Sequence, residues 1–184
     1  NLLAGQEATE YLCRLGHRRI AYLGSDSSLM FSADRRAGYQ AALLRHGLPV
    51  NPDYCVEVPS LLKDFSGRIQ QLLTHPERPT GILVSDDILA VALGRVCLEA
   101  GLTVPRDISI ISFNNSLLAR LSAPQLTSID VNSFQLGIEA ASQVINHIEN
   151  PNLMATKIIV PHHLIERESC CPPMENPVDP SGGI

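Results

Sequence analysis

The sequence predicts an α/β protein in which helices cover both faces of a parallel β-sheet. Along most of the 184 residues, segments with apolar residues at helical spacing alternate with short, almost continuously apolar runs. The two clearest runs, residues 81–85 and 108–113, flank a helical segment at residues 88–100. These three segments together form one parallel βαβ unit. The sequence contains no internal repeats.

The elements before this unit follow the same alternation. We predict helices at residues 2–15, 33–46 and 61–75, strands at residues 20–24 and 54–58, and a polar loop at residues 25–32. Gly16, Gly47 and Pro76 end the three helices, because glycine permits the left-handed backbone of a helix end and proline cannot continue a helix.

The elements after the unit are shorter. We predict an irregular leucine-rich segment at residues 117–124, a strand at 126–130, a helix at 133–148, and short strands at 158–160 and 164–165. Leucines in an irregular segment indicate burial against a partner such as a second subunit. From residue 170 onward proline, glycine and asparagine dominate, which predicts a disordered tail at 170–184.

Polar side chains follow both strands of the central unit. Ser85, Asp86 and Asp87 end the first strand, and Asn114 and Asn115 end the second. Parallel strands deliver these ends to one edge of the sheet, where open α/β folds bind ligands. Such side chains suit hydroxyl groups better than a pyrophosphate, which requires glycine backbone. Capping of the following helix by one residue of this group is the alternative interpretation, and ligand contact is a separate hypothesis.

Composition excludes several classes of protein. The net charge is −5, and only two of the 14 basic residues are lysines, Lys63 and Lys157, so no basic stripe for nucleic acid is present. No apolar run approaches the roughly 20 residues of a membrane span. Five cysteines without paired metal spacing indicate reduced thiols and a cytoplasmic location. The chain opens at Asn1 within a helical pattern, so we expect it to be part of a longer protein.

Catalytic motifs are absent. The sequence contains no GxGxxG, GxxxxGK[ST], GxSxG, HExxH or paired CxxC motif, so we expect no catalytic residues, no cofactor and no metal. His17 stands between a helix end and a strand, where a histidine usually bonds nearby backbone rather than acting as a base. Arg35 and Arg36 begin a helix about 100° apart, so only one of them can face a given cleft, and a solvated surface is the alternative for both.

Five blocks of the sequence carry a family resemblance. They are GHRRIAYLG, SADRRAGYQAALLRHGL, PTGILVSDDILAVALGRVCLEAGLTVPRDISIISFNN, PQLTSIDVNSFQLGIEAA and HLIER. In this order, and over residues 1–169, they resemble the effector-binding domain of LacI/GalR-family transcriptional regulators. The SFNN and LTSIDVN forms look most like the maltose-operon repressors of Gram-positive bacteria.

The resemblance implies a periplasmic-binding-protein-like fold, with two three-layer α/β lobes around a cleft. The chain would cross between the lobes near residues 25, 131–132 and 161. Residues 1–25 and 132–160 would then form part of an N-terminal lobe that is incomplete in this chain, and residues 26–131 and 161–169 the C-terminal lobe. The helix-turn-helix that binds operator DNA in this family is missing from the chain.

The resemblance also implies site residues. Arg35, unlike Arg36, matches the arginine that holds the effector. Asp86 stands where family members contact sugar hydroxyls, with Asp87 beside it as the helix cap, and Asn114 stands where most members have aspartate. Further candidates are Asp130 and Asn132 at a crossover, and Phe31 for stacking on a sugar, while Phe113 is either stacking or core. For a dimer interface we predict Leu89, Leu93, Val96, Leu117, Leu118 and Leu121, the alternative for the first three being packing on their own sheet.

These expectations together describe a cytoplasmic, homodimeric, allosteric repressor whose effector is maltose or a related sugar. Effector binding would shift the population of lobe orientations and so change operator affinity. The protein would not be an enzyme. The rival interpretations are a sugar-binding receptor of an ABC transporter, which shares the fold, and a sugar-modifying enzyme.

Overall fold

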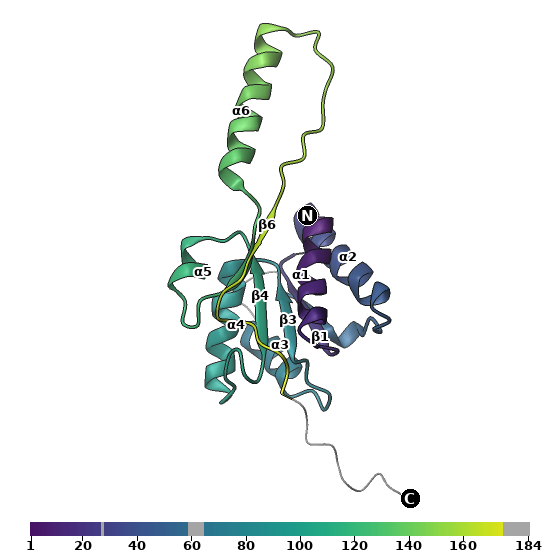
Figure 1. The fold of residues 1–184 in the computed structure, drawn as a ribbon, viewed down its shortest axis with the longest axis vertical. Helices are drawn as coiled ribbons and strands as arrows, with labels where there is room; N and C mark the ends of the chain where they lie inside the picture. The colour runs from purple at the N-terminus through teal and green to yellow at the C-terminus, as the bar shows by residue number, and fades with distance from the viewer. Residues whose placement is uncertain (27, 59–64, 175–184) are drawn as a thin grey trace, which may run out of the picture.

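The computed structural model describes residues 1–26, 28–58 and 65–174 and contains one six-stranded sheet between two helical layers (Figure 1). The strands have the order β2-β1-β3-β4-β5-β6, and every neighbouring pair is parallel except β5 and β6. They are β1 (Ile20–Gly24), β2 (Cys55–Glu57), β3 (Gly81–Val84), β4 (Ser109–Phe113), β5 (Thr127–Asp130) and β6 (His163–Ile165). The helices are α1 (Leu2–Arg14), α2 (Met30–Arg45), the 3-10 turn η1 (Pro52–Tyr54), α3 (Phe65–Leu73), α4 (Asp87–Glu99), α5 (Leu117–Leu121) and α6 (Ser133–Glu149). The predicted α/β fold with a parallel sheet is confirmed.

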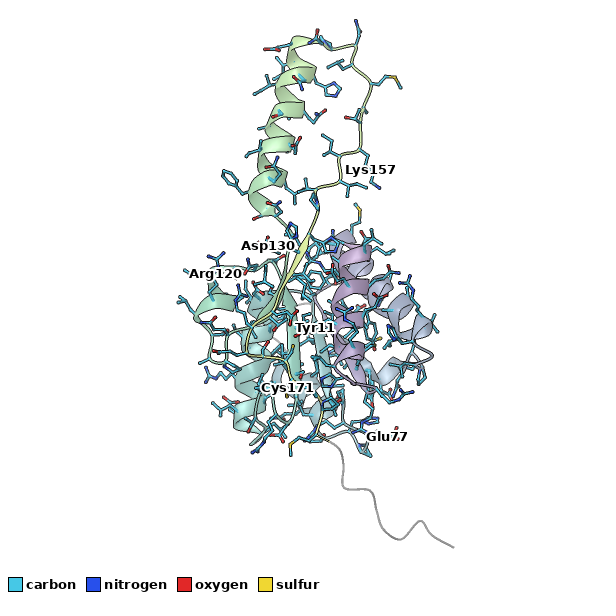
Figure 2. All side chains as sticks on the ribbon, in the orientation of Figure 1. Tyr11, Glu77, Arg120, Asp130, Lys157 and Cys171 are labelled. Carbon is cyan, nitrogen blue, oxygen red and sulfur yellow. The ribbon has the colours of Figure 1, made fainter. Side chains whose placement is uncertain are left out.

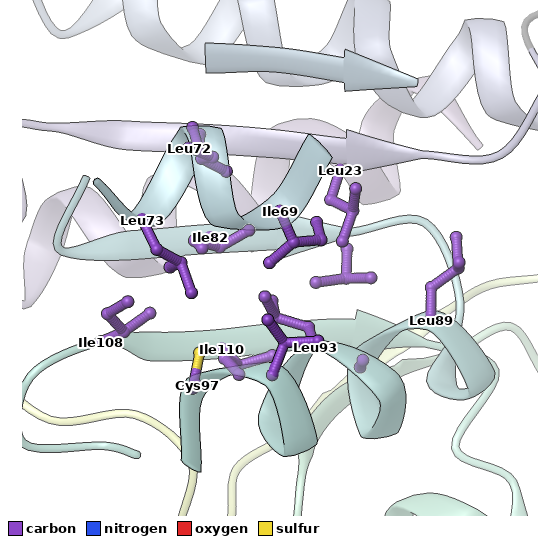
Figure 3. Packing of buried hydrophobic residues seen from close by; sticks show 14 of the residues in the cluster. Leu23, Ile69, Leu72, Leu73, Ile82, Leu89, Leu93, Cys97, Ile108 and Ile110 are labelled. Carbon is purple, nitrogen blue, oxygen red and sulfur yellow. The ribbon is translucent and has the colours of Figure 1, made fainter. Parts of the chain in front are cut away.

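The two faces of the sheet carry separate hydrophobic cores. Successive strand residues point to opposite faces, so Tyr22 and Leu83 pack against α1 and α2. Leu23 and Ile82 point the other way, into a core that α3 and α4 complete with residues such as Leu93 (Figure 3). Because both faces are covered, the strands are apolar along their whole length, which is why they read as unbroken hydrophobic runs.

Helices α1 and α2 approach closely through two glycines. A Cβ atom on Gly38 would lie 2.2 Å from the carbonyl oxygen of Leu2, and one on Gly5 would lie 2.4 Å from the carbonyl oxygen of Arg35. Neither position can hold a side chain without moving a backbone. The contact therefore fixes the first turns of α2, which carry Arg35, against α1.

The segment after β6 is bound to the sheet. The backbone N–H of Ile110 donates to the Ser169 carbonyl at 2.8 Å, and the Cys171 N–H donates to Ser109 Oγ at 3.0 Å. His17 is buried and lies 2.9 Å from both the Cys171 carbonyl and Thr80 Oγ1. The prediction of a disordered tail was thus wrong for residues 170–174, which lie along the sheet and of which Cys171 is hydrogen-bonded through both its backbone N–H and its carbonyl, and residues 175–184 lie outside the described part. The prediction that His17 bonds nearby groups is confirmed.

Helix α6 and the returning segment 150–162 project beyond the sheet (Figure 1). No residue of α6 is buried, although its sequence is apolar on one side, and Phe134 and Ile148 are 80% and 74% exposed. The predicted strand at 158–160 does not form, because no strand of the described chain lies beside it. Helix α6 and residues 150–162 thus have apolar side chains like those of a hydrophobic core, but no described helix or strand covers them.

Three other predictions differ from the structure. The helix predicted at 33–46 begins at Met30, because Tyr22 Oη donates to the Ser32 carbonyl and holds the first turn on β1. Residues 117–121 of the predicted irregular segment form α5. Of the helix predicted at 61–75, residues 61–64 lie outside the described part and Phe65–Leu73 are helical.

The assignment of residues 1–25 to a separate lobe was wrong. Strand β1 pairs with both β2 and β3 in the middle of the one sheet, and α1 packs on that sheet beside α2. Residues 1–25 therefore belong to the same lobe as residues 28–58 and 65–131. No helix in the described ranges is long and apolar enough to cross a membrane.

Candidate functional site

A cavity of about 660 Å³ lies at the carboxyl edge of the sheet. Its walls come from Asn1, from α2, from the residues that follow β3 and β4, from α5, and from Val131 and Leu136 around the start of α6. The chain passes from β1 outward to β2 and then returns to β3 on the other side of β1. Ligands bind at such a switch point in open α/β sheets, because the loops from neighbouring strands diverge there.

Arg35 lies under this cavity with only 5% of its surface exposed. Its guanidinium carbon lies 4.1 Å from the ring centroid of Phe113 and 5.1 Å from that of Phe31. Its Nη1 donates to the Ser85 carbonyl at 2.5 Å. Burial lowers the pKa of Arg35 to about 10, against the opposing effect of Tyr22 and the nearby aspartates. Stacking and hydrogen bonding together hold the side chain in one position before any ligand arrives.

Asp86 and Asp87 have different roles. Asp86 is the N-cap of α4: its Oδ1 accepts from the Leu89 N–H at 2.9 Å, and the side chain also lines the cavity. Asp87 is 1% exposed and accepts from Ser112 Oγ at 2.5 Å, Ser128 Oγ at 2.9 Å and the Ser116 N–H at 2.7 Å. The prediction that Asp87 is the cap was therefore wrong. Asp87 instead ties the start of α4 to β4, to β5 and to the start of α5.

Asn114 and Phe31 complete the part of the site that the sequence predicted. Asn114 adopts a positive φ of 96°, which turns its side chain from the end of β4 toward Arg35, and its Oδ1 accepts from Arg35 Nη2 at 3.4 Å. Phe31 lies in the first turn of α2 and lines the cavity. The structure thus brings together Phe31, Arg35, Asp86 and Asn114. Phe113 is fully buried, so the core alternative holds for it.

Asp130 and Asn132 do not line this cavity, and their contact with an effector stays a prediction. Asp130 accepts two hydrogen bonds, at Oδ2 from Asn115 Nδ2 at 2.9 Å and at Oδ1 from the Asn132 N–H at 2.7 Å. The bond from Asn115 is the largest cause of the lowered pKa of Asp130. Arg167 donates to Asn115 Oδ1 at 2.5 Å, which adds the strand returning from α6 to the network. Asp130 lies at the base of the projecting segment (Figure 2). Val131, between the two predicted residues, is the one that faces the cavity.

Half of the predicted dimer interface is buried inside the chain. Leu89, Leu93 and Val96 are at most 5% exposed and belong to the core beneath α4, so the prediction was wrong for them and the alternative is correct. Leu117, Leu118 and Leu121 on α5 are 67%, 43% and 72% exposed, respectively. Leu117 and Leu118 also line the cavity.

The chemistry of the cavity is that of binding. The residues that line it supply hydrogen-bond donors from Arg35 and Asn114, acceptors from Asp86, and apolar surface from Phe31, the two leucines of α5, Val131 and Leu136. A polyol presents both hydroxyl groups and an apolar ring face and matches such walls. The lining contains no histidine, cysteine or lysine. Over the described ranges, no cluster of three potential metal ligands occurs.

Sequence reasoning missed the contacts that three residues make in this region. Asn1 accepts from Arg35 Nε at 3.2 Å, but a terminal residue preceding a helix carries no signal of a long-range contact. Asn115 and Arg167 hold the two connections to α6 together, and 51 residues separate them. The asparagine pair at the end of β4 was the available signal, because asparagine tolerates left-handed backbone better than most residues.

Comparisons with known proteins agree with this geometry. Residues 9–170 match the family model described as "Periplasmic binding protein-like domain". The ribose operon repressor of Escherichia coli K12 is 33% identical over 169 residues, and the transcriptional repressor CytR of the same strain is 31% identical over 169 residues. Each alignment covers 92% of this chain, and 51% and 50% of those proteins, so the chain spans about half the length of these relatives. The crystal structure of a LacI-type transcriptional regulator from Bacillus cereus superposes with a TM-score of 0.87 at 35% identity, over 92% of this chain and 60% of that one.

Proposed function

The chain belongs to the periplasmic binding protein-like domains, and we propose that it is the effector-binding domain of a LacI-family transcriptional regulator, in which it binds a sugar effector for a bacterial repressor. The observation that carries the proposal is the meeting of Arg35, Asp86 and Asn114 in one cavity at the carboxyl edge of the sheet. Arg35 stands on α2, whereas Asp86 follows β3 and Asn114 follows β4, and none of the three belongs to the hydrophobic cores of the sheet.

The chain would be the C-terminal lobe of the effector domain, with α6 and residues 150–160 belonging to the opposite lobe. The absence of any buried residue in α6, and the exposure of apolar side chains such as Phe134 and Met154, support this assignment, because these apolar residues would be the core of the other lobe. A ligand between the lobes would contact Val131 and Leu136 near the connection as well as Arg35 below.

Signal transmission would use the network at the connection. Asn115 and Arg167 join β5, which leads to α6, to the returning strand β6. A ligand that changes the angle between the lobes would turn both connections together, which is the hinge type of two-state movement. A coupling of about 1–3 kcal/mol would change operator affinity by one to two orders of magnitude.

The complete protein would carry a DNA-binding head, act in the cytoplasm and work as a homodimer. Exposure of Leu117, Leu118 and Leu121 on α5 is consistent with a subunit contact. The proposed protein is not an enzyme and needs no cofactor or metal. No observation favours the transporter receptor over the repressor, since the relatives reported above are repressors.

The test is calorimetric titration of the complete protein with neutral, acidic and phosphorylated sugars. Maltose is included as the reference, because the maltose-operon assignment stays a prediction. Saturable binding that Asp86→Ala weakens and Arg36→Ala leaves unchanged supports the proposal. Arg36 is a matched control because its guanidinium pairs with Glu57 outside the cavity. Absence of binding by every sugar in the panel refutes it.

A further inference from the structure

The positive charge of Arg35 has no ionic partner in the described chain. Its three hydrogen bonds go to neutral acceptors, which are Asn1 Oδ1, the Ser85 carbonyl and Asn114 Oδ1. Among the ion pairs of the described residues none includes Arg35. With 5% of its surface exposed, the guanidinium is also largely removed from water. A buried charge without a counter-charge is unfavourable, and ordinary cores avoid it.

Asp86 and Asp87 act on Arg35 electrostatically, but their hydrogen bonds go to other groups. Asp87 is 1% exposed and accepts three hydrogen bonds, from Ser112, Ser116 and Ser128. Asp86 caps α4 with one oxygen and accepts from Ser85 Oγ at 3.3 Å with the other. Both lower the potential around Arg35, but neither neutralises it by direct contact.

The groups around Arg35 that remain free are donors. A guanidinium has five N–H groups, and three of those on Arg35 are used, so two are left. The Oδ1 of Asn114 accepts from Arg35, so the amide Nδ2 of Asn114 is the group that it can offer to the cavity. Aspartate at this position would instead have paired with Arg35 and presented an acceptor. Asparagine therefore converts this end of the cavity into a site for a negatively charged acceptor.

Two other groups of the cavity wall favour a sugar ring. Asp86 offers carboxylate oxygens to hydroxyl groups, and Phe31, whose ring centroid lies 5.1 Å from the Arg35 guanidinium carbon, offers an apolar face. A ligand that fits all of these groups has one anionic group and several hydroxyls. A single carboxylate fits better than a phosphate dianion, because it matches the planar fork of one guanidinium and because Asp86 and Asp87 would repel a second negative charge.

We propose that the effector is a sugar acid, such as a uronate or an aldonate, whose carboxylate pairs with Arg35 and Asn114 while its hydroxyls bind Asp86. This inference rests on the proposed function, since it names the ligand class of the same cavity. It also assigns Asn114 as the residue that distinguishes acidic from neutral sugars.

The test compares matched ligands on the complete protein. Galacturonate and galactose, and gluconate and glucose, are titrated calorimetrically, with maltose and glucose 6-phosphate beside them. We expect one sugar acid to bind at least about 30-fold more tightly than its neutral counterpart, as for a buried, hydrogen-bonded charge pair. Its affinity should also fall as salt concentration rises.

Asn114→Asp provides the sharpest variant, because it changes one atom and places a carboxylate beside Arg35. The preference for the sugar acid over its neutral counterpart, measured as the ratio of the two affinities, should fall about 30-fold or more. Arg35→Gln should abolish the preference for the acid, and Arg36→Ala should keep it. Circular dichroism and thermal unfolding check that each variant is folded.

The outcomes separate this inference from the function on which it rests. Tight binding of a neutral sugar, weakened by Asp86→Ala and without preference for the acid, overturns the inference and leaves the proposed function standing. Preference for glucose 6-phosphate also overturns it, as does a preference for the acid that Asn114→Asp does not reduce. If no sugar binds, both the inference and the proposed function fail.

Discussion

Replacing Asp87 by alanine should destabilise the chain far more than replacing its neighbour Asp86. The Asp87 carboxylate is buried and accepts hydrogen bonds from two serine hydroxyls and the Ser116 N–H. Each buried donor that loses its charged acceptor lowers the free energy of unfolding by about 1–3 kcal/mol. The hydroxyls of Ser112 and Ser128 can rotate toward other acceptors, so we expect a total loss of about 3–5 kcal/mol rather than the full sum.

Asp86→Ala is the matched control, because it removes an adjacent aspartate that only caps α4 and faces the cavity. Loss of a cap costs about 1 kcal/mol. The free energy of unfolding is measured by urea titration followed by far-ultraviolet circular dichroism. If Asp87→Ala and Asp86→Ala lower this free energy equally within about 1 kcal/mol, the hydrogen-bond network around Asp87 does not stabilise the fold as argued.

Three further predictions concern the packing and the buried ionisable groups. Gly38→Ala should lower the free energy of unfolding by about 1–3 kcal/mol, because its Cβ would overlap the Leu2 carbonyl. Gly94 lies in open space on α4, so Gly94→Ala should raise this free energy by about 0.5–1 kcal/mol in the same urea titration. Burial lowers the pKa of His17, so the stabilisation from its neutral form is complete above about pH 6.5 and is lost as the pH falls from there to the lowered pKa. The free energy of unfolding of the wild type should therefore fall more between pH 7.5 and pH 5 than that of His17→Gln. Equal losses in the two proteins would contradict this. Burial raises the pKa of the Cys97 thiol to about 12, so a thiol reagent at pH 8 should modify Cys97 only when urea unfolds the chain. Rapid labelling of Cys97 in the folded chain would instead show that the core beneath α4 opens.

The sheet was predictable because burial on both faces leaves a strong local signal. Apolar runs such as residues 108–113 and glycine helix ends such as Gly16 and Gly101 mark the strands and helices without reference to partners. The projecting segment was predicted less well. Residues 158–160 are as apolar as a strand, but a strand forms only beside a partner, and no described strand lies next to them.

The site was predictable to the extent that it lies directly at strand ends. Asp86 and Asn114 follow β3 and β4, so topology alone brings them to one edge. The choice between Asp86 and Asp87 as cap was not decidable from sequence, because either residue type caps a helix well. It depended on Ser112 and Ser128, which surround Asp87 from neighbouring strands and are distant in sequence.

The pairing of β5 with β6 makes the molecule divisible. Asp130 and His163 are direct antiparallel partners, so the chain leaves the sheet and returns to it at one rung of the ladder. A two-residue hairpin turn could bridge that rung, since antiparallel neighbours need no longer connection. Residues 131–162 are therefore a detachable module. An engineer could excise it to obtain a minimal scaffold that keeps Arg35, Asp86 and Asn114 but loses the cavity wall of Val131 and Leu136, or graft a foreign module in its place.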